Sequence, residues 1–303
     1  MDKIFILLLI ILICTSCSND EIDHIELTAP INVTLPKNPK TLNILAIGNS
    51  FTEDATTLLP SILEDLDIKN VTLGRLTYNS GSLENHYMFY NNKSNVYQFS
   101  ITENNIWNDI SNTYSINEAI KYTDWDIIVI QQASYKAGIY NSFQPYLNGL
   151  LNNIYRDCHN KNVVFGWHLT WSYSADCNRP QFSDYNYSQE RMYNAIIETT
   201  TSMIKDTGIA LIIPSGITIQ NLRNTSLNNP PKDITRDGFH IDLGIGRYAL
   251  AYTWFQSIIT PCFNRQIQES SYIPPFTEGI KVNKDNLQIV LDVVQKSCKD
   301  PLK

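Results

Sequence analysis

The stretch that decides the fold is LNILAIGNSF, residues 42–51. It begins with mostly apolar residues over the length of a strand and ends in a glycine followed by polar residues. A continuous apolar run bounded by a turn residue is typical of a strand that is buried on both faces of a parallel sheet. We therefore expect the first strand of the sheet over Leu42–Gly48, with Ser50 directly after its end.

Further apolar runs alternate with amphipathic segments of helical length. The other expected strands are Asn70–Leu76, Asp126–Gln131, Val163–Leu169 and Ala210–Pro214. The expected helices are Ala55–Leu66, Gln144–Cys158, Ser188–Lys205, Gly246–Ile258 and Asn283–Gln295, with a short one around Ile116–Tyr122. Strands separated by helices pair in parallel and carry helices on both faces. The sequence thus predicts an α/β fold: a doubly wound, mainly parallel five-stranded sheet between helices, with residues 84–123 as an insertion over the site.

The first residues have the layout of a secretory signal. Residues 1–16 contain an early lysine, an apolar run and then small residues, and the run is too short to span a bilayer. The end of this segment, Thr15-Ser16-Cys17, resembles the cleavage box of bacterial lipoproteins, although Cys14 is atypical at its position. We therefore expect lipidation of Cys17 after cleavage.

The stretch that follows is polar and lacks periodicity. We interpret residues 17–41 as a tether and residues 42–303 as one catalytic domain. The acidic run at residues 18–21 resembles the export tag of some surface lipoproteins, but short acidic runs are also common in solvated segments. The expected location is therefore the bacterial outer membrane, with the domain periplasmic or on the cell surface and the N-terminal lipid as its only membrane contact.

Charge and residue spacing argue against nucleic acid and metal ions as partners. The formal net charge is −7 and there is no basic stripe, so nucleic acid is not an expected partner. Within the mature domain, no closely spaced pair of cysteines or histidines suggests a metal site. Four cysteines of the mature domain allow three disulfide pairings, among which the sequence does not choose: Cys158, Cys177, Cys262 and Cys298.

Two short segments carry catalytic residue types. Ser50 follows the first strand, and ligands of open α/β sheets bind at the carboxyl ends of the strands. Asp237-Gly238-Phe239-His240 lies beyond the last strand, where His240 could act as general base and Asp237 could hold its tautomer. Each segment alone is more simply structural, since a serine often caps a helix and a lone DxxH is common. Their combination favours a serine hydrolase.

Together the two segments resemble a known superfamily. GNSF at residues 48–51 is similar to the first block of the SGNH, or GDSL-like, hydrolases, and Asp237–His240 resembles their last block. The resemblance covers residues 42 to about 260 and implies an SGNH or flavodoxin-like three-layer fold. It also implies Ser50 as nucleophile, Asp237 and His240 as the rest of the triad, and no cofactor.

The resemblance further implies an oxyanion hole, with one departure. The Ser50 backbone N–H and that of Gly81, in Asn79-Ser80-Gly81, match two of the family's donors, although an ordinary turn glycine is the alternative for Gly81. In place of the usual asparagine of the third block stand Gln131 and Gln132. Adjacent strand residues point to opposite sides, and we expect Gln132 to be the donor.

Other residues near strand ends are candidates for substrate contact. They are Gln131, His86, His168 and Trp171. A hydrogen-bonded structural histidine is an equal alternative for His86 and His168, and a packed tryptophan is the stronger one for Trp171. The function expected from these residues is a serine esterase that removes acyl groups, acetyl foremost, from carbohydrate. A glycan-binding lipoprotein without catalysis and a lipase or methyl esterase remain alternatives.

Overall fold

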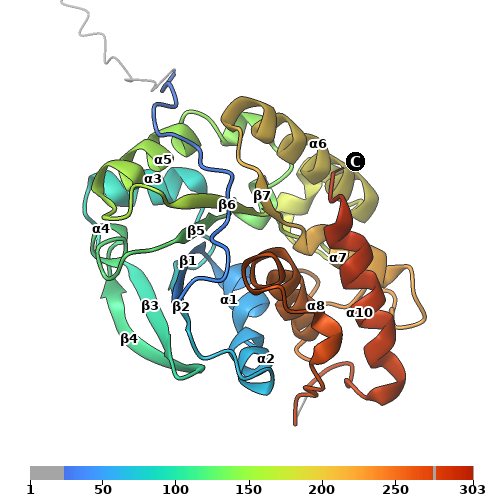
Figure 1. The fold of residues 1–303 in the computed structure, drawn as a ribbon. Coiled ribbons are helices and arrows are strands. Elements are labelled where there is room, and N and C mark those ends of the chain that lie inside the picture. Colours follow the sequence, from blue (N-terminus) through green and yellow to red (C-terminus); the bar gives the residue numbers. More distant parts are fainter. Residues whose placement is uncertain (1–23, 276–277, 303) are drawn as a thin grey trace, which may run out of the picture.

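A computed structural model describes residues 24–275 and 278–302. Its centre is a seven-stranded sheet in the order β4-β3-β2-β1-β5-β6-β7, with helices on both faces (Figure 1). Five strands pair in parallel, namely β1 (Leu42–Gly48), β2 (Val71–Thr77), β5 (Ile127–Ile130), β6 (Val164–His168) and β7 (Leu211–Ile213). All of the strands expected from the sequence are present, and the doubly wound α/β fold is confirmed.

The count of five strands was too low. The segment expected as an insertion contains β3 (Tyr97–Glu103) and β4 (Ile106–Tyr114), which pair antiparallel and extend the sheet beyond β2. β4 is a mostly exposed edge strand, so its sequence lacks the apolar alternation of a half-buried strand. The hairpin turn is Asn104-Asn105, both with positive φ, which is a common residue choice for a two-residue hairpin loop.

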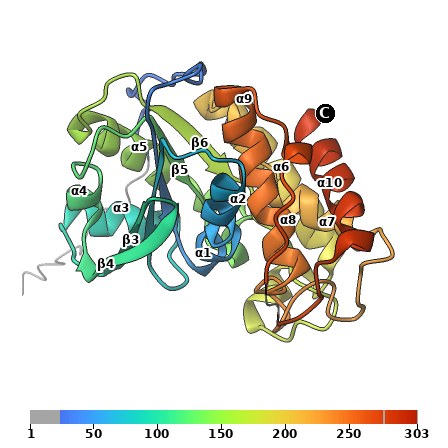
Figure 2. The same ribbon diagram turned by 60° about the horizontal axis from the view of Figure 1, so that its bottom comes forward.

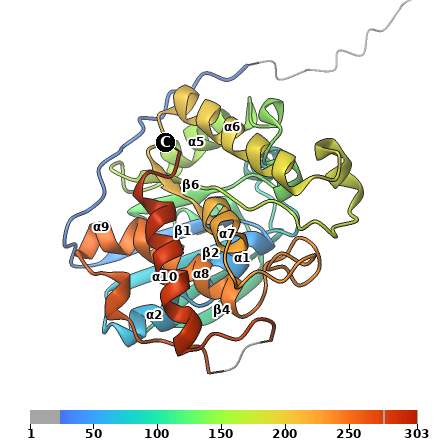
Figure 3. The same cartoon turned by 90° about the vertical axis from the view of Figure 1, so that its right-hand side faces the viewer.

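Two layers of helices cover the sheet (Figures 1 and 2). One layer contains α3 (Leu83–Asn91), α5 (Tyr146–Asp157) and α6 (Gln189–Thr207). The other contains α1 (Ser50–Thr56), α2 (Leu59–Asp65), α7 (Ser215–Arg223), α8 (Ile245–Trp254) and α10 (Lys284–Lys299), with α10 running along α7 and α8 (Figure 3). Two short helices, α4 (Ile116–Ala119) and α9 (Thr260–Phe263), complete the set.

The helix expected over Ala55–Leu66 is two helices. α1 begins at Ser50, directly after the first strand, and α2 begins at Leu59 with Pro60 in its first turn. Proline is favoured there because the amide hydrogen that it lacks would have no partner within the helix. The early start of α1 matters for function, because it places Ser50 in the first turn of a helix.

Residues 24–41 do not stand away from the domain as a tether. The Asn152 side chain accepts hydrogen bonds from the N–H groups of Thr28 and Ala29, both 2.8 Å, and Leu27 packs against the core. The packed part of the chain therefore begins before Leu42. The predicted signal, Cys17 and the first residues of the tether lie outside the described residues.

The described residues contain neither a membrane-spanning helix nor a disulfide among the four cysteines of the domain. Within residues 24–275 and 278–302, no helix is both long enough and apolar enough to cross a bilayer. The four cysteines for which the sequence left pairing open are free thiols, three of them buried and Cys298 partly exposed.

Candidate active site

Ser50 lies at the carboxyl end of the central strand. β1 ends at Gly48, and the side-chain oxygen of Asn49 caps α1 by accepting the N–H of Phe51 at 3.0 Å. A Cβ at Gly48 would lie 2.2 Å from the Thr52 hydroxyl oxygen, so only glycine fits this turn. The turn therefore holds Ser50 at the carboxyl edge of the sheet, where α/β folds bind ligands.

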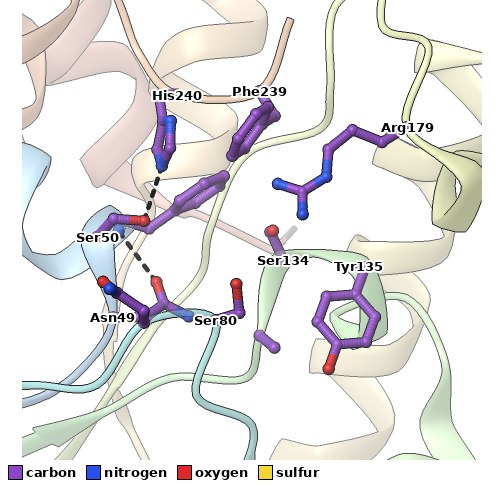
Figure 4. A pocket seen from close by; sticks show the side chains of 11 residues that line it. Asn49, Ser50, Ser80, Ser134, Tyr135, Arg179, Phe239 and His240 are labelled. Atoms are coloured by element: carbon purple, nitrogen blue, oxygen red, sulfur yellow. Dashed lines mark hydrogen bonds between the residues drawn. The ribbon is translucent and has the colours of Figure 1, made fainter. Parts of the chain in front are cut away.

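The three residues expected as a triad are brought together. Ser50 Oγ lies 2.8 Å from His240 Nε2, and His240 Nδ1 lies 2.7 Å from Asp237 Oδ2. Figure 4 shows the imidazole pointing at the serine hydroxyl. In this chain of contacts the imidazole can accept the serine proton while the carboxylate holds the other ring nitrogen as a donor.

Asp237 is held in its ionised form. Partial burial acts to raise its pKa, but hydrogen bonds from the His240 side chain and backbone outweigh this and leave the pKa of Asp237 below its usual value. Its second oxygen accepts the N–H groups of His240, at 2.8 Å, and Phe239, at 3.3 Å. These hydrogen bonds hold the short loop from Asp237 to His240 around the carboxylate of its first residue.

Neighbouring segments fix this loop from outside. Gly238 has φ +93, and its carbonyl accepts the N–H of Ser174 at 2.8 Å. The Trp171 indole donates to the carbonyl of Phe239 at 2.8 Å, and its ring stacks on Phe51 at 4.1 Å. Trp171 is fully buried, so the structure places it under the catalytic loop and not in contact with substrate.

A buried carboxylate connects the loop to two helices. Asp54 of α1 is 1% exposed and pairs with Arg236 at 2.9 Å and with Arg247 of α8 at 2.6 Å. The backbone N–H of Arg236 donates to the carbonyl of His240 at 3.0 Å. The ion cluster Asp54–Arg236–Arg247 therefore joins the helix that begins with Ser50 to the loop that carries His240.

Neither glutamine occupies the expected position in an oxyanion hole. The Gln132 amide nitrogen donates to the Ser142 carbonyl at 3.1 Å, and its oxygen accepts the N–H of Leu83 at 3.0 Å. Gln132 is buried and does not line the pocket beside Ser50. The expectation for Gln132 is therefore wrong in geometry, because its amide closes the loops around β5.

Gln131 and His168 form a buried relay behind Asn49. Gln131 Nε2 donates to Asn49 Oδ1 at 2.8 Å, and Gln131 Oε1 lies 3.0 Å from His168 Nδ1. His168 Nε2 in turn lies 2.9 Å from the Ser215 hydroxyl. Both residues are buried, so they hold Asn49 in place and do not contact substrate. Burial lowers the pKa of His168 to about 3.

Gly81 and His86 also have packing roles. The Gly81 N–H donates to the Tyr78 carbonyl at 2.9 Å, which engages the hydrogen expected to bind the oxyanion. A Cβ at Gly81 would lie 2.8 Å from the ring of His86. His86 is fully buried, with Nδ1 2.7 Å from the Tyr97 hydroxyl, and burial lowers its pKa to about 4. His86 is therefore not a substrate contact.

A cavity of about 300 Å³ opens beside Ser50. Sequence reasoning missed several of the residues that line it along with Ser50, Asn49, Phe239 and His240, namely Ser80, Ser134, Tyr135 and Arg179 (Figure 4). Arg179 lies in the segment that follows the carboxyl end of β6. Loops at this end of the strands commonly bind substrate, so its position in the sequence could have identified Arg179 as a candidate. Among the described residues, no group of three or more His, Cys, Asp or Glu side chains is arranged to hold a metal ion.

Known proteins resemble the chain to different degrees. No curated protein matches it. A DUF4886 family protein of known structure from Bacteroides uniformis is 31% identical, covering 87% of this chain and 96% of its own, with a TM-score of 0.78. A proposed SGNH hydrolase from Slackia heliotrinireducens (18% identity, TM-score 0.43, 72% of this chain and 98% of its own) and an acetyl xylan esterase (13%, 0.47, 72% and 100%) are also similar. The last two likenesses are too distant to carry a conclusion about the reaction. The family described as "Domain of unknown function (DUF4886)" matches residues 43–291, and this chain belongs to it.

Proposed function

We propose that this protein is a serine ester hydrolase of the SGNH type, which removes acyl groups through an acyl-Ser50 intermediate. One observation carries the proposal: Ser50, His240 and Asp237 form a continuous hydrogen-bonded series of 2.8 and 2.7 Å beside an open cavity. A glycan-binding protein without catalysis has no need for these distances.

The order of proton transfers follows from the contacts of His240 with Ser50 and Asp237. His240 Nε2 takes the proton of Ser50 Oγ as that oxygen attacks the ester carbonyl carbon, and Asp237 stabilises the imidazolium that forms. The tetrahedral intermediate collapses, and the imidazolium gives its proton to the leaving alcohol oxygen. A water then enters, loses a proton to His240 and attacks the acyl carbon. The bond to Ser50 Oγ breaks, the imidazolium returns its proton to that oxygen, and the acid is released. These steps need no cofactor.

We assign the oxyanion donors to Ser50 and Asn49. The backbone N–H of Ser50, in the first turn of α1, has no partner within the helix. Asn49 Nδ2 donates one hydrogen to the Gly81 carbonyl at 3.2 Å, which leaves its second hydrogen for a ligand, and Asn49 is one of the residues that line the pocket. The amide that the resemblance places in the third block is thus supplied by the residue before the nucleophile.

The cavity favours a small substrate. Its volume of about 300 Å³ is at the low end of ligand pockets, and Ser, Asn and Tyr side chains lie among the apolar residues that line it. A long acyl chain would require an extended apolar channel, so a short acyl group such as acetyl on a carbohydrate fits better.

The test is release of acetate from acetylated oligosaccharides, combined with covalent labelling by a fluorophosphonate. We expect the protein to release acetate and to be labelled at Ser50. Ser50→Ala should lose both properties, with turnover reduced by about 10⁴-fold or more. Ser134→Ala, which removes another hydroxyl of the same pocket, should still be labelled. Labelling that survives in Ser50→Ala would overturn the nucleophile, and glycan binding without acetate release would favour the non-catalytic alternative.

A further inference from the structure

Arg179 presents a guanidinium to the cavity beside Ser50. Its Cζ lies 4.1 Å from the centre of the Phe239 ring, and its side chain points into the space between Phe239 and Ser134 (Figure 4). Stacking of a guanidinium on an aromatic ring fixes its plane but leaves its N–H edge free for hydrogen bonds. The arginine is therefore oriented before any ligand arrives.

The charge of Arg179 is not neutralised within the part of the chain that the structure describes. Over residues 24–275 and 278–302, no ion pair joins Arg179 to a carboxylate, whereas Arg236 and Arg247 near the same site both pair with Asp54. The side chain of Asp176, the nearest acidic residue in the sequence, accepts a hydrogen bond from Ser174.

The cavity contains no opposite charge either. Its eleven lining residues include no Asp or Glu. The whole chain carries a formal charge of −7, so a lone cation at this position does not belong to a generally basic surface. An unpaired guanidinium beside the nucleophile indicates that the ligand itself brings the anion.

We propose that Arg179 binds a carboxylate of the ester substrate, so that the enzyme acts on acylated acidic carbohydrate or on esters whose acyl chain ends in a carboxylate. This inference rests on the proposed esterase function and narrows its substrate class. A guanidinium matches the two oxygens of a carboxylate with two parallel hydrogen bonds. The cavity offers one fixed cation, which suits a singly charged carboxylate better than a doubly charged phosphate.

The carboxylate and the ester can be bound at the same time. The Phe239 ring contacts both the Arg179 guanidinium and the His240 ring. The centroids of the Phe239 and His240 rings are 4.0 Å apart. Arg179 and His240 therefore contact the same aromatic ring, in a single small cavity that Ser50 also lines. A single sugar unit with an acyl group and a carboxyl group, or a short dicarboxylic acyl ester, can extend from Arg179 to Ser50.

Matched substrates test the two sources of the carboxylate. One pair is the acetylated methyl glycoside of glucuronic acid against that of glucose, and the other is 4-nitrophenyl hemisuccinate against 4-nitrophenyl butyrate. We expect kcat/KM to favour the acidic member of at least one pair, which names the source. Arg179→Gln should reduce kcat/KM for that acidic ester by about 10- to 100-fold, mainly through KM, and change its neutral partner by less than about threefold. Arg179→Lys should recover only part of the loss, because lysine lacks the planar fork.

A control variant and a binding measurement separate this inference from the esterase proposal. Arg191→Gln, at an exposed position of α6, changes the net charge equally and should leave the preference for acidic esters intact. Calorimetric titration of the Ser50→Ala variant with glucuronate, succinate and glucose measures recognition without turnover. Binding of either acid that is lost on adding Arg179→Gln would support the carboxylate site even if no ester were hydrolysed. Hydrolysis without any preference for acidic esters, equal losses for both members of a pair, or no binding of either acid would overturn it while leaving the esterase intact.

Discussion

Asn49 makes contacts with three segments that meet at the nucleophile. Its oxygen accepts the N–H of Phe51 and the amide of Gln131, while its nitrogen donates to the carbonyl of Gly81. The residue is 2% exposed, so these contacts fix the orientation of its side chain beside Ser50. A donor that is held before the reaction begins can stabilise a developing oxyanion without reorganising.

Asn49→Asp should test this assignment of the oxyanion donor. The carboxylate keeps the size of the side chain and the acceptors for Phe51 and Gln131, but it removes the donor and places negative charge beside the forming oxyanion. We expect kcat to fall by about 10²- to 10³-fold or more, with KM nearly constant. The measurement is steady-state hydrolysis of a small acetyl ester, with circular dichroism to confirm folding.

Gln132→Ala provides the comparison for Asn49→Asp. It removes the hydrogen bonds to Leu83 and Ser142 and should lower the melting temperature while changing kcat only a few-fold. A larger loss of kcat at Gln132 than at Asn49 would return the role of donor to the glutamine.

At the scale of elements, the ion cluster around Asp54 joins α1 to the catalytic loop and to α8. Replacing Asp54 by Asn leaves Arg236 and Arg247 facing a neutral amide, and the Arg236 backbone is bonded directly to His240. Small displacements of catalytic groups are costly for the rate. We expect Asp54→Asn to reduce kcat by about tenfold or more with little change in KM, and to lower the free energy of unfolding by about 1 to 3 kcal/mol.

Asp67→Asn is the matched control for Asp54→Asn. The Asp67–Lys69 pair is exposed at the surface, with 82% of the Asp67 side chain accessible, and pairs of this kind contribute little to stability. Urea unfolding and steady-state kinetics of both variants make the comparison. Wild-type kcat in Asp54→Asn would show that the cluster does not position the loop.

The buried histidines His86 and His168 make stability depend on pH. Burial lowers their pKa values to about 4 and about 3, whereas an unfolded histidine titrates near 6.5. Between pH 5 and 6.5 the unfolded chain therefore binds more protons than the folded one, so stability falls as the pH falls. The slope is at most about 1.4 kcal/mol per pH unit for each histidine.

His168→Gln should make this slope shallower. A glutamine does not titrate, yet it keeps a donor for Gln131 and an acceptor for Ser215. Urea unfolding at several values between pH 5 and 6.5 measures the effect. An unchanged slope in His168→Gln would contradict the neutral, buried state of His168.

Sequence patterns predicted those elements whose burial is strong and regular. The five parallel strands are apolar on both faces, so their runs stand out, whereas the exposed edge strand β4 offers no such run. Ser50 and His240 were predicted because their blocks are short and local. The side chains that Gln132 and Gly81 contact come from distant segments, and Arg179 reaches the pocket through the path of a loop, so no local pattern specifies them.

At the scale of the whole molecule, the sheet separates the site from the N-terminal segment at residues 32–41. The Asn32 side chain donates to the Val163 carbonyl just before β6, and Asn70, just before β2, donates to the carbonyl of Lys40. This segment therefore crosses the amino ends of the strands, whereas Ser50 lies at the carboxyl end of β1. An anchor attached ahead of this segment would leave the packing of the active site unaltered.

The last prediction concerns that anchor. Cys17 follows an apolar run and two small residues, and we propose that a lipid attached to it holds the protein at the outer membrane. Cys17→Ala should move the protein from the membrane fraction to the soluble fraction, while its kcat/KM on a soluble acetyl ester stays within about twofold of wild type, an effect of under 0.5 kcal/mol. Cys14→Ala, in the same stretch, is the matched control and should remain in the membrane fraction, because the cysteine that would carry the lipid is intact. If Cys17→Ala stayed with the membrane, the anchor would have to be something other than a lipid on Cys17. If both variants became soluble, the apolar stretch and not the lipid would be the determinant.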